Sequence, residues 1–115
     1  MRFMLLIYSN EKNDHQPGSA GFDEMMAGYG AFTEEVTANG MMKAGDPLLP
    51  IGTAKTARMR GNQAVISSGP FAETTEQLGG YYILDCKDID EAAKYALKIP
   101  AAKQGCVEIR PIMEM

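Results

Sequence analysis

The order of periodic segments along the chain constrains its fold more than any other feature of the sequence. Two segments with the apolar spacing of helices, 23–40 and 88–99, each lie between segments with the character of strands. Asp88, with Glu91 three residues later, predicts a capped start for the second helix. Arg2 to Tyr8 is a nearly continuous apolar run, which is typical of a strand covered on both faces. Tyr81 to Cys86 is a second central-strand candidate, and 105–113 predicts the last strand. The alternation in that last strand places Cys106, Glu108 and Arg110 on one side. The chain therefore predicts two strand–helix–strand units.

The middle of the chain adds strands between the two helices. Met41 to Ala44 predicts a short strand, and 53–60 and 64–67 predict a hairpin that turns at Gly61-Asn62. The order is βαββαβ with an extra hairpin, the α+β ferredoxin-like pattern. Right-handed crossovers place the first strand beside 81–86, with both helices on one face of the sheet. We expect a single domain over 1–115.

Composition excludes several classes of function. The formal net charge is −4, and Arg58 and Arg60 are too few to form the basic patch that a nucleic acid requires. No segment approaches the roughly 20 apolar residues of a membrane span, and no signal peptide is visible at Met1 to Tyr8. We therefore expect a cytoplasmic protein with no nucleic-acid partner and no membrane partner.

The two cysteines, Cys86 and Cys106, match no zinc spacing, and the only histidine, His15, is remote from both in sequence. The expected topology puts them on strands separated by one other strand, about 9–10 Å apart at ~4.8 Å per step. A disulfide needs Cα atoms within about 7 Å. We expect two reduced cysteines, no metal and no cofactor.

A long loop, Ser68 to Gly80, joins the hairpin to the next strand and mixes glycines and a proline with a hydroxyl, carboxylates and a phenyl ring. Long loops bounded by clear strands are uncommon in compact domains, and they tend to be functional. We expect the loop to lie at the edge of a cleft and to be ordered by packing of Phe71.

With this loop, the chain resembles the YCII-related family, in the branch named for its Asp-Gly-Pro-Phe motif (DGPF). The resemblance spans nearly the whole chain. It rests on Met4-Leu5-Leu6-Ile7-Tyr8, Tyr29-Gly30-Ala31-Phe32-Thr33-Glu34-Glu35, Gly69-Pro70-Phe71-Ala72-Glu73-Thr74, Glu76-Gln77-Leu78-Gly79-Gly80-Tyr81, the helix start at Asp90 to Ala92, and Val107-Glu108-Ile109-Arg110-Pro111.

The resemblance implies a homodimer, an α+β barrel in which two sheets pack face to face around shared pockets. Most members of the family have no assigned reaction. In the wider family a His–Asp pair has been proposed as catalytic, and one relative acts in the breakdown of a chlorinated aromatic. Here Ser68 replaces the aspartate of the motif, and His15 lies in a turn-rich loop. The pair cannot be carried over to this chain.

Candidate catalytic residues come from the loop. Ser68 is a possible nucleophile, although no neighbouring base is identifiable, and a hydroxyl that bonds turn backbone is the simpler interpretation. Glu73 and Glu76 are possible acid–base groups if they are buried in a pocket, with Glu73 the preferred base. Phe71 either anchors the loop in the core or lines a pocket or the dimer seam.

Two strand residues are candidates for substrate binding. Tyr8 ends a central strand, where a phenol often closes a pocket with one polar group. Arg110 has a planar fork suited to an anionic substrate, or it forms a salt bridge with Glu108 of another subunit or with a loop acid.

Three functions remain open from the sequence. The first is a small-molecule enzyme that acts on a polar aromatic or lactone-like compound in a cleft between sheet and helices and at the dimer. The second is a ligand-binding or regulatory dimer without catalysis. The third is a structural partner that has no pocket. A carboxylate buried in a cleft with a strongly shifted pKa would favour the enzyme.

Overall fold

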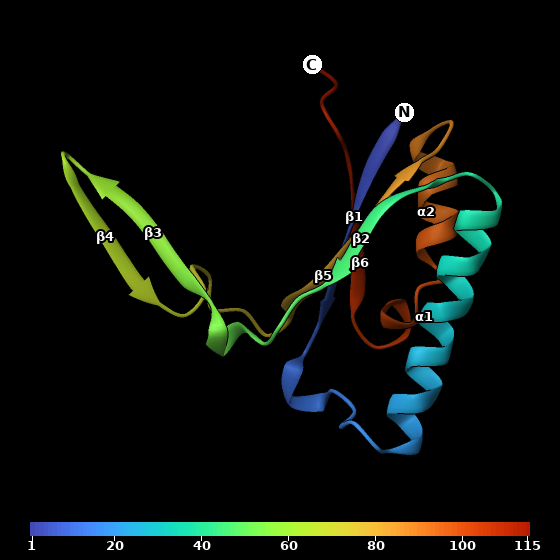
Figure 1. Cartoon of the computed structure of the whole chain (residues 1–115), viewed down its shortest axis with the longest axis horizontal. Coiled ribbons are helices and arrows are strands. Elements are labelled where there is room, and N and C mark those ends of the chain that lie inside the picture. The colour runs from blue at the N-terminus through green and yellow to red at the C-terminus, as the bar shows by residue number, and fades with distance from the viewer.

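The computed structural model describes residues 1–115 as a two-layer α+β domain with a projecting hairpin (Figure 1). The strands are β1 (Arg2–Ser9), β2 (Met42–Pro47), β3 (Lys55–Arg60), β4 (Gln63–Ser68), β5 (Gln77–Asp85) and β6 (Cys106–Pro111). The α-helices are α1 (Ala20–Ala38) and α2 (Ile89–Ala96), and short 3-10 helices span Glu11–Asn13, Ile51–Thr53 and Pro100–Lys103. No helix combines the length and apolar character needed to cross a membrane.

The main sheet has the strand order β2-β5-β1-β6, and its paired strands are all antiparallel. This confirms the expected ferredoxin-like arrangement, with β5 and β6 on either side of β1. Cys86 follows β5 and Cys106 begins β6, so β1 separates their strands, and both thiols are free.

The sheet has one covered face and one open face. Phe3, Leu5 and Ile7 of β1 lie on the face toward the helices, where each is at most 7% exposed. They join Phe32 and Val36 of α1 in the core. The alternate β1 residues, Met4, Leu6 and Tyr8, face the other side, which no helix covers. The expectation of a strand covered on both faces is therefore wrong for the single chain.

The helices begin at recognisable caps. Ser19 Oγ accepts a hydrogen bond from the Phe22 N–H, so α1 starts three residues before the expected Asp23. Asp88 Oδ1 accepts from the Glu91 N–H at 2.9 Å, as the sequence of this helix predicts. Gly28 marks close packing, because a Cβ there would lie 2.8 Å from Pro100 Cγ.

The two glycines inside α1 predict opposite responses to alanine. Gly30 faces open space, so Gly30→Ala should raise the free energy of unfolding by about 1 kcal/mol, the usual helix preference for alanine. Gly28→Ala should lose that gain, because its new methyl group meets the Pro100 ring. Urea unfolding of the two variants checks this, and equal stabilisation would contradict the close packing of α1 on Pro100.

The hairpin of β3 and β4 stands apart from the main sheet as a separate two-stranded sheet, on the side away from the helices (Figure 1). Its strands and turn agree with the sequence prediction. The following loop is shorter than expected, since β5 already begins at Gln77 and residues 77–80 belong to it.

Candidate functional site

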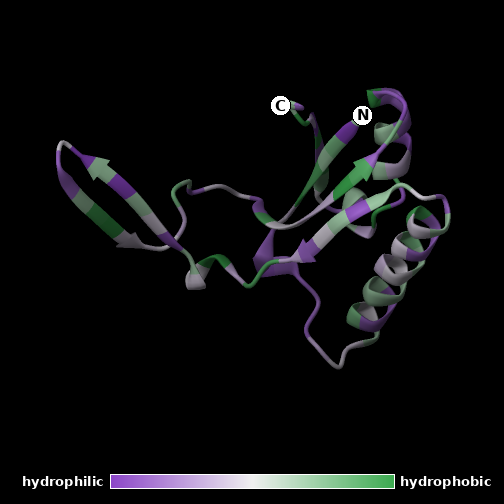
Figure 2. Ribbon diagram, turned by 45° about the horizontal axis from the view of Figure 1, so that its top comes forward, coloured by the Kyte–Doolittle hydropathy of each residue, from purple (hydrophilic) through white to green (hydrophobic).

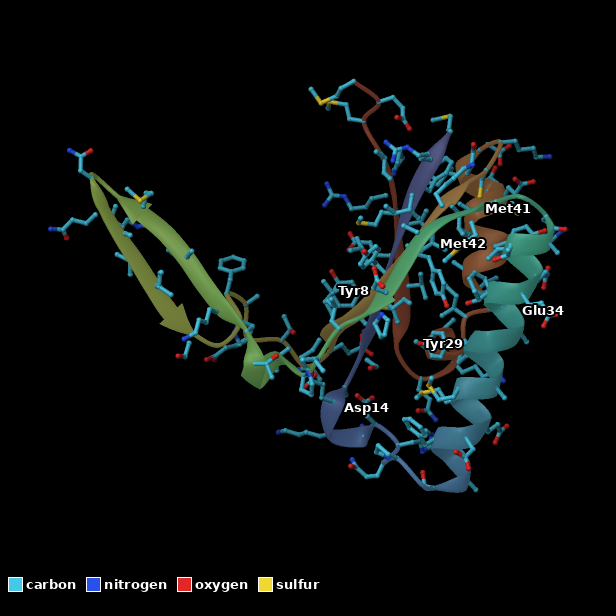
Figure 3. All side chains as sticks on the ribbon, in the orientation of Figure 1. Tyr8, Asp14, Tyr29, Glu34, Met41 and Met42 are labelled. Carbon is cyan, nitrogen blue, oxygen red and sulfur yellow. The ribbon has the colours of Figure 1, made fainter.

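A hollow of about 430 Å³ lies on the open face of the sheet, at the end of β1 and beneath the loop that precedes β5. It is lined by two carboxylates, a phenol, a thiol and two hydroxyls, from Glu76, Glu108, Tyr8, Cys106, Thr74 and Thr75. Figure 3 shows Tyr8 on the side of the sheet away from α1. The lining holds no basic side chain. Its chemistry is therefore that of hydrogen-bond acceptors and weak acids.

Strand register brings three of these side chains together. Tyr8 pairs with Cys106 across β1 and β6, and Glu108 follows two residues later on the same face. The Tyr8 hydroxyl donates to Glu108 Oε1 at 3.4 Å. Gly105 permits this approach of β6, because a Cβ at that position would lie 2.0 Å from the Tyr8 carbonyl oxygen. The hollow therefore depends on a close contact between two backbones.

The loop before β5 forms the other wall of the hollow, and hydrogen bonds of Gln77 hold that loop in place. The side-chain amide of Gln77 donates to the carbonyl of Thr74 at 2.6 Å and accepts from the Glu11 N–H at 2.9 Å. The Thr74 hydroxyl also donates to the carbonyl of Glu76. These bonds hold Glu76 over the sheet, where the Cys106 thiol donates to its Oε1 at 3.6 Å.

The environment keeps the phenol and the thiol protonated. Partial burial raises the pKa of Tyr8, and the neighbouring Glu108 carboxylate adds to the rise. Burial likewise raises the pKa of the Cys106 thiol, with Glu76 as the next cause. A thiol above its ordinary pKa is a poor nucleophile at neutral pH. Tyr8 and Cys106 therefore act as hydrogen-bond donors, and the carboxylates are the groups able to accept a proton.

Of the predicted loop residues, Glu76 lines this hollow, and Ser68, Glu73 and Phe71 lie outside it. Ser68 ends β4 at the base of the hairpin, opposite Lys55. Glu73 is exposed and lines neither of the two main hollows. Phe71 is 76% exposed, and the guanidinium of Arg58 lies 5.3 Å from the centre of its ring. The expectation that Phe71 orders the loop by packing in the core is wrong, because Gln77 organises the loop instead.

The remaining candidates are divided between the two sides of the domain. Tyr8 is in the hollow. Arg110 shares its open face, two residues beyond Glu108, but does not line it. His15 packs against Gly21 at the start of α1, where a Cβ would lie 2.4 Å from its Nδ1. Sequence reasoning missed Cys106 and Glu108 as site residues, although the alternation of β6 had already placed both on one side.

A larger hollow of about 670 Å³ follows one face of α1, and its polar groups come from one helix. Tyr29, Thr33 and Glu34 are among its lining residues. The cleft expected between sheet and helices is instead filled by core side chains, including the edge-to-face pair of Phe32 and Tyr82 with ring centres 5.0 Å apart. Convergent polar groups distinguish the hollow at Tyr8, so we take it as the candidate site.

The fold and this open-faced site are those of a ferredoxin-like α+β protein whose sheet presents polar groups on its uncovered side. The chain belongs to the YCII-related domain family, whose model matches residues 1–115. An uncharacterised protein of Rhizobium meliloti (strain 1021) is 30% identical over 114 residues, which cover 97% of this chain and 92% of that protein.

A solved structure shares the fold. It is 5-chloro-2-hydroxyhydroquinone dehydrochlorinase (TftG) from Burkholderia phenoliruptrix AC1100, in complex with 2,5-dihydroxybenzoquinone. The similarity covers 100% of this chain and 96% of that one, with a TM-score of 0.55 and 15% sequence identity. This likeness confirms the fold class expected from the order of strands and helices.

Proposed function

We propose that this protein is a small-molecule enzyme that binds a neutral, polyhydroxylated aromatic compound in the hollow at Tyr8. The observation that carries the proposal is the convergence of Glu76 and Glu108 around Tyr8 and Cys106, with no basic side chain in the lining. Two carboxylates accept hydrogen bonds from two ring hydroxyls. An anionic ligand would meet like charge there.

The chemistry that this arrangement supports is acid–base catalysis. A carboxylate, Glu76 or Glu108, takes the proton of a ring hydroxyl and leaves a phenolate. The Tyr8 hydroxyl, held in its protonated form, donates a hydrogen bond to the developing charge. The structural neighbour, by its name, acts on a chlorinated hydroxyhydroquinone, and this supports a hydroxylated ring as the substrate class.

We further propose that two copies of the chain form a homodimer in which their open sheet faces pack against each other. Met4, Leu6 and Ile83 form an apolar strip on the open face, since Met4 pairs with Ile83 across β1 and β5. Such a strip on a sheet needs a cover, and a second copy about a two-fold axis supplies the same strip in return. The dimer would then close the hollow, which is open in one chain.

The test is a calorimetric titration, without oxygen, with hydroquinone, resorcinol and benzoate. The two phenols should bind, and benzoate should bind about tenfold more weakly, because its carboxylate faces Glu76 and Glu108. Tighter binding of benzoate would contradict the proposal and would favour the anion-binding role predicted for Arg110.

The second candidate function is a ligand-binding or regulatory dimer without catalysis. The absence of the family's His–Asp pair favours it, since Ser68 replaces the aspartate and His15 lies in the loop before α1, against Gly21. A screen of hydroxylated aromatics and lactones separates the two candidates. Binding with turnover supports the enzyme, and binding without any turnover supports the binding module.

A further inference from the structure

The hairpin of β3 and β4, which we call the arm (residues 55–68), lacks the support that such an element needs. Every residue of its two strands except Thr56 is exposed. A two-stranded hairpin is marginally stable by itself in water. The chain's radius of gyration is 16.0 Å, against about 13 Å for a compact domain of this length. The arm therefore extends well beyond the domain and has one side available for a partner.

The two faces of the arm differ in character. Register pairs Ala57 with Ile66 and Met59 with Ala64, and these four side chains share one face, with Lys55 and Ser68 at its base. Met59 is 61% exposed and Ile66 is 65% exposed. Figure 2 shows a hydrophobic stretch in the middle of β4, in which Ile66 lies on this face and Val65 on the other. We call this the apolar face.

The opposite face is basic and already has a contact within its own chain. It carries Thr56, Arg58, Arg60, Gln63, Val65 and Ser67. Arg58 stacks on the Phe71 ring, so this face is turned toward the loop of the same chain. The apolar face is thus the one that lacks a cover.

The arm and the rest of the molecule have net charges of opposite sign. The arm holds three of the eleven basic residues of the chain and none of its fifteen acidic residues. The body therefore carries eight basic and fifteen acidic residues, a strongly acidic balance. Two arms would repel each other, whereas an arm and a body attract.

We propose that the arm is an exchange arm, whose apolar face packs on the body of a second copy of this chain. The arm of each copy packs on the body of the other, as two-fold symmetry requires. The arm leaves the domain on the side of the open sheet face (Figure 1), so a second copy that packs on that face lies within reach of the arm. The proposal rests on the homodimer of the proposed function and adds the element that joins the two copies.

Neighbouring residues of β4 give a matched test. Ile66→Lys places a charge on the apolar face, and Val65→Lys places the same charge on the basic face. Sedimentation velocity should find wild type as a dimer. The dissociation constant of the Ile66→Lys dimer should be about tenfold higher, and that of the Val65→Lys dimer should be close to wild type. Both variants should keep the circular dichroism of the folded chain, because both sites are exposed in one copy. Added salt should weaken the wild-type dimer.

Each of the other outcomes contradicts the exchange-arm proposal, and the outcomes can be told apart. A wild-type dimer that Ile66→Lys leaves unchanged shows that the arm lies outside the interface, while the dimer of the proposed function stands. If both lysine variants weaken the dimer equally, the apolar face is not the surface that contacts the second copy. A wild-type monomer at high micromolar concentration contradicts both the homodimer and the exchange arm. The hydroquinone titration then tests the binding site in the hollow independently.

Discussion

Replacing either carboxylate of the hollow should remove most of its affinity for phenols. Glu76→Gln and Glu108→Gln each exchange a charged acceptor for a neutral amide of similar shape, and a hydrogen bond to a charged group contributes about 1.5–3 kcal/mol. We expect hydroquinone to bind about tenfold or more weakly to each variant, as measured by calorimetry. If the protein turns over a phenol, the variant that lacks the catalytic base should also lose that activity.

Glu73→Gln is the matched control, because Glu73 lies in the same loop three residues before Glu76 and does not line the hollow. It should bind hydroquinone as wild type does. Loss of binding or turnover in Glu73→Gln, with Glu76→Gln unaffected, would return the role of base to Glu73, as the loop motif predicted. Ser68→Ala should likewise leave binding unchanged.

Gly105→Ala should destabilise the protein and abolish the site in one step. The new Cβ would lie 2.0 Å from the Tyr8 carbonyl oxygen and 3.0 Å from its carbon, so the backbone of β6 must move. We expect a loss of about 3 kcal/mol in the free energy of unfolding, at the upper end for an overpacked site. Cys106 and Glu108 move with the strand, and hydroquinone binding should fall with stability.

Gly79→Ala is the control for this change. Gly79 is an exposed residue of β5, and a Cβ there meets nothing within 4 Å. Urea unfolding should place this variant close to wild type. A Gly105→Ala protein as stable as Gly79→Ala, with hydroquinone affinity intact, would show that the approach of β6 to Tyr8 does not shape the hollow.

The fold could be predicted because its signals are local. Helical spacing, the Asp88 cap and the turn at Gly61-Asn62 each act over a few residues, and crossover handedness then limits how the strands are ordered. Two features escaped this reasoning. The open face of β1 looks as apolar as its buried face in the sequence, and nothing in the hairpin pattern shows that the hairpin projects from the domain.

The candidate site could be predicted only in part. Two residues named from the sequence line the hollow: Tyr8, because it ends a central strand, and Glu76 of the loop. Glu108 and Cys106 were placed on one side of their strand, but their meeting with Tyr8 depends on the register between β1 and β6, which involves residues about a hundred positions apart. The loop motif drew attention to Phe71 and Glu73, because unusual backbone residues are visible in a sequence and the hydrogen bonds of Gln77 are not.

The central claim is that the hollow at Tyr8 is the binding site, and amide chemical shifts test it most directly. In a titration of the labelled protein with hydroquinone, we expect the shifts to move at the lining of the hollow, which is Tyr8, Thr74, Thr75, Glu76, Cys106 and Glu108. Changes concentrated instead along the groove of α1, at Met26, Tyr29 and Thr33, would contradict the account and place the ligand on the helix.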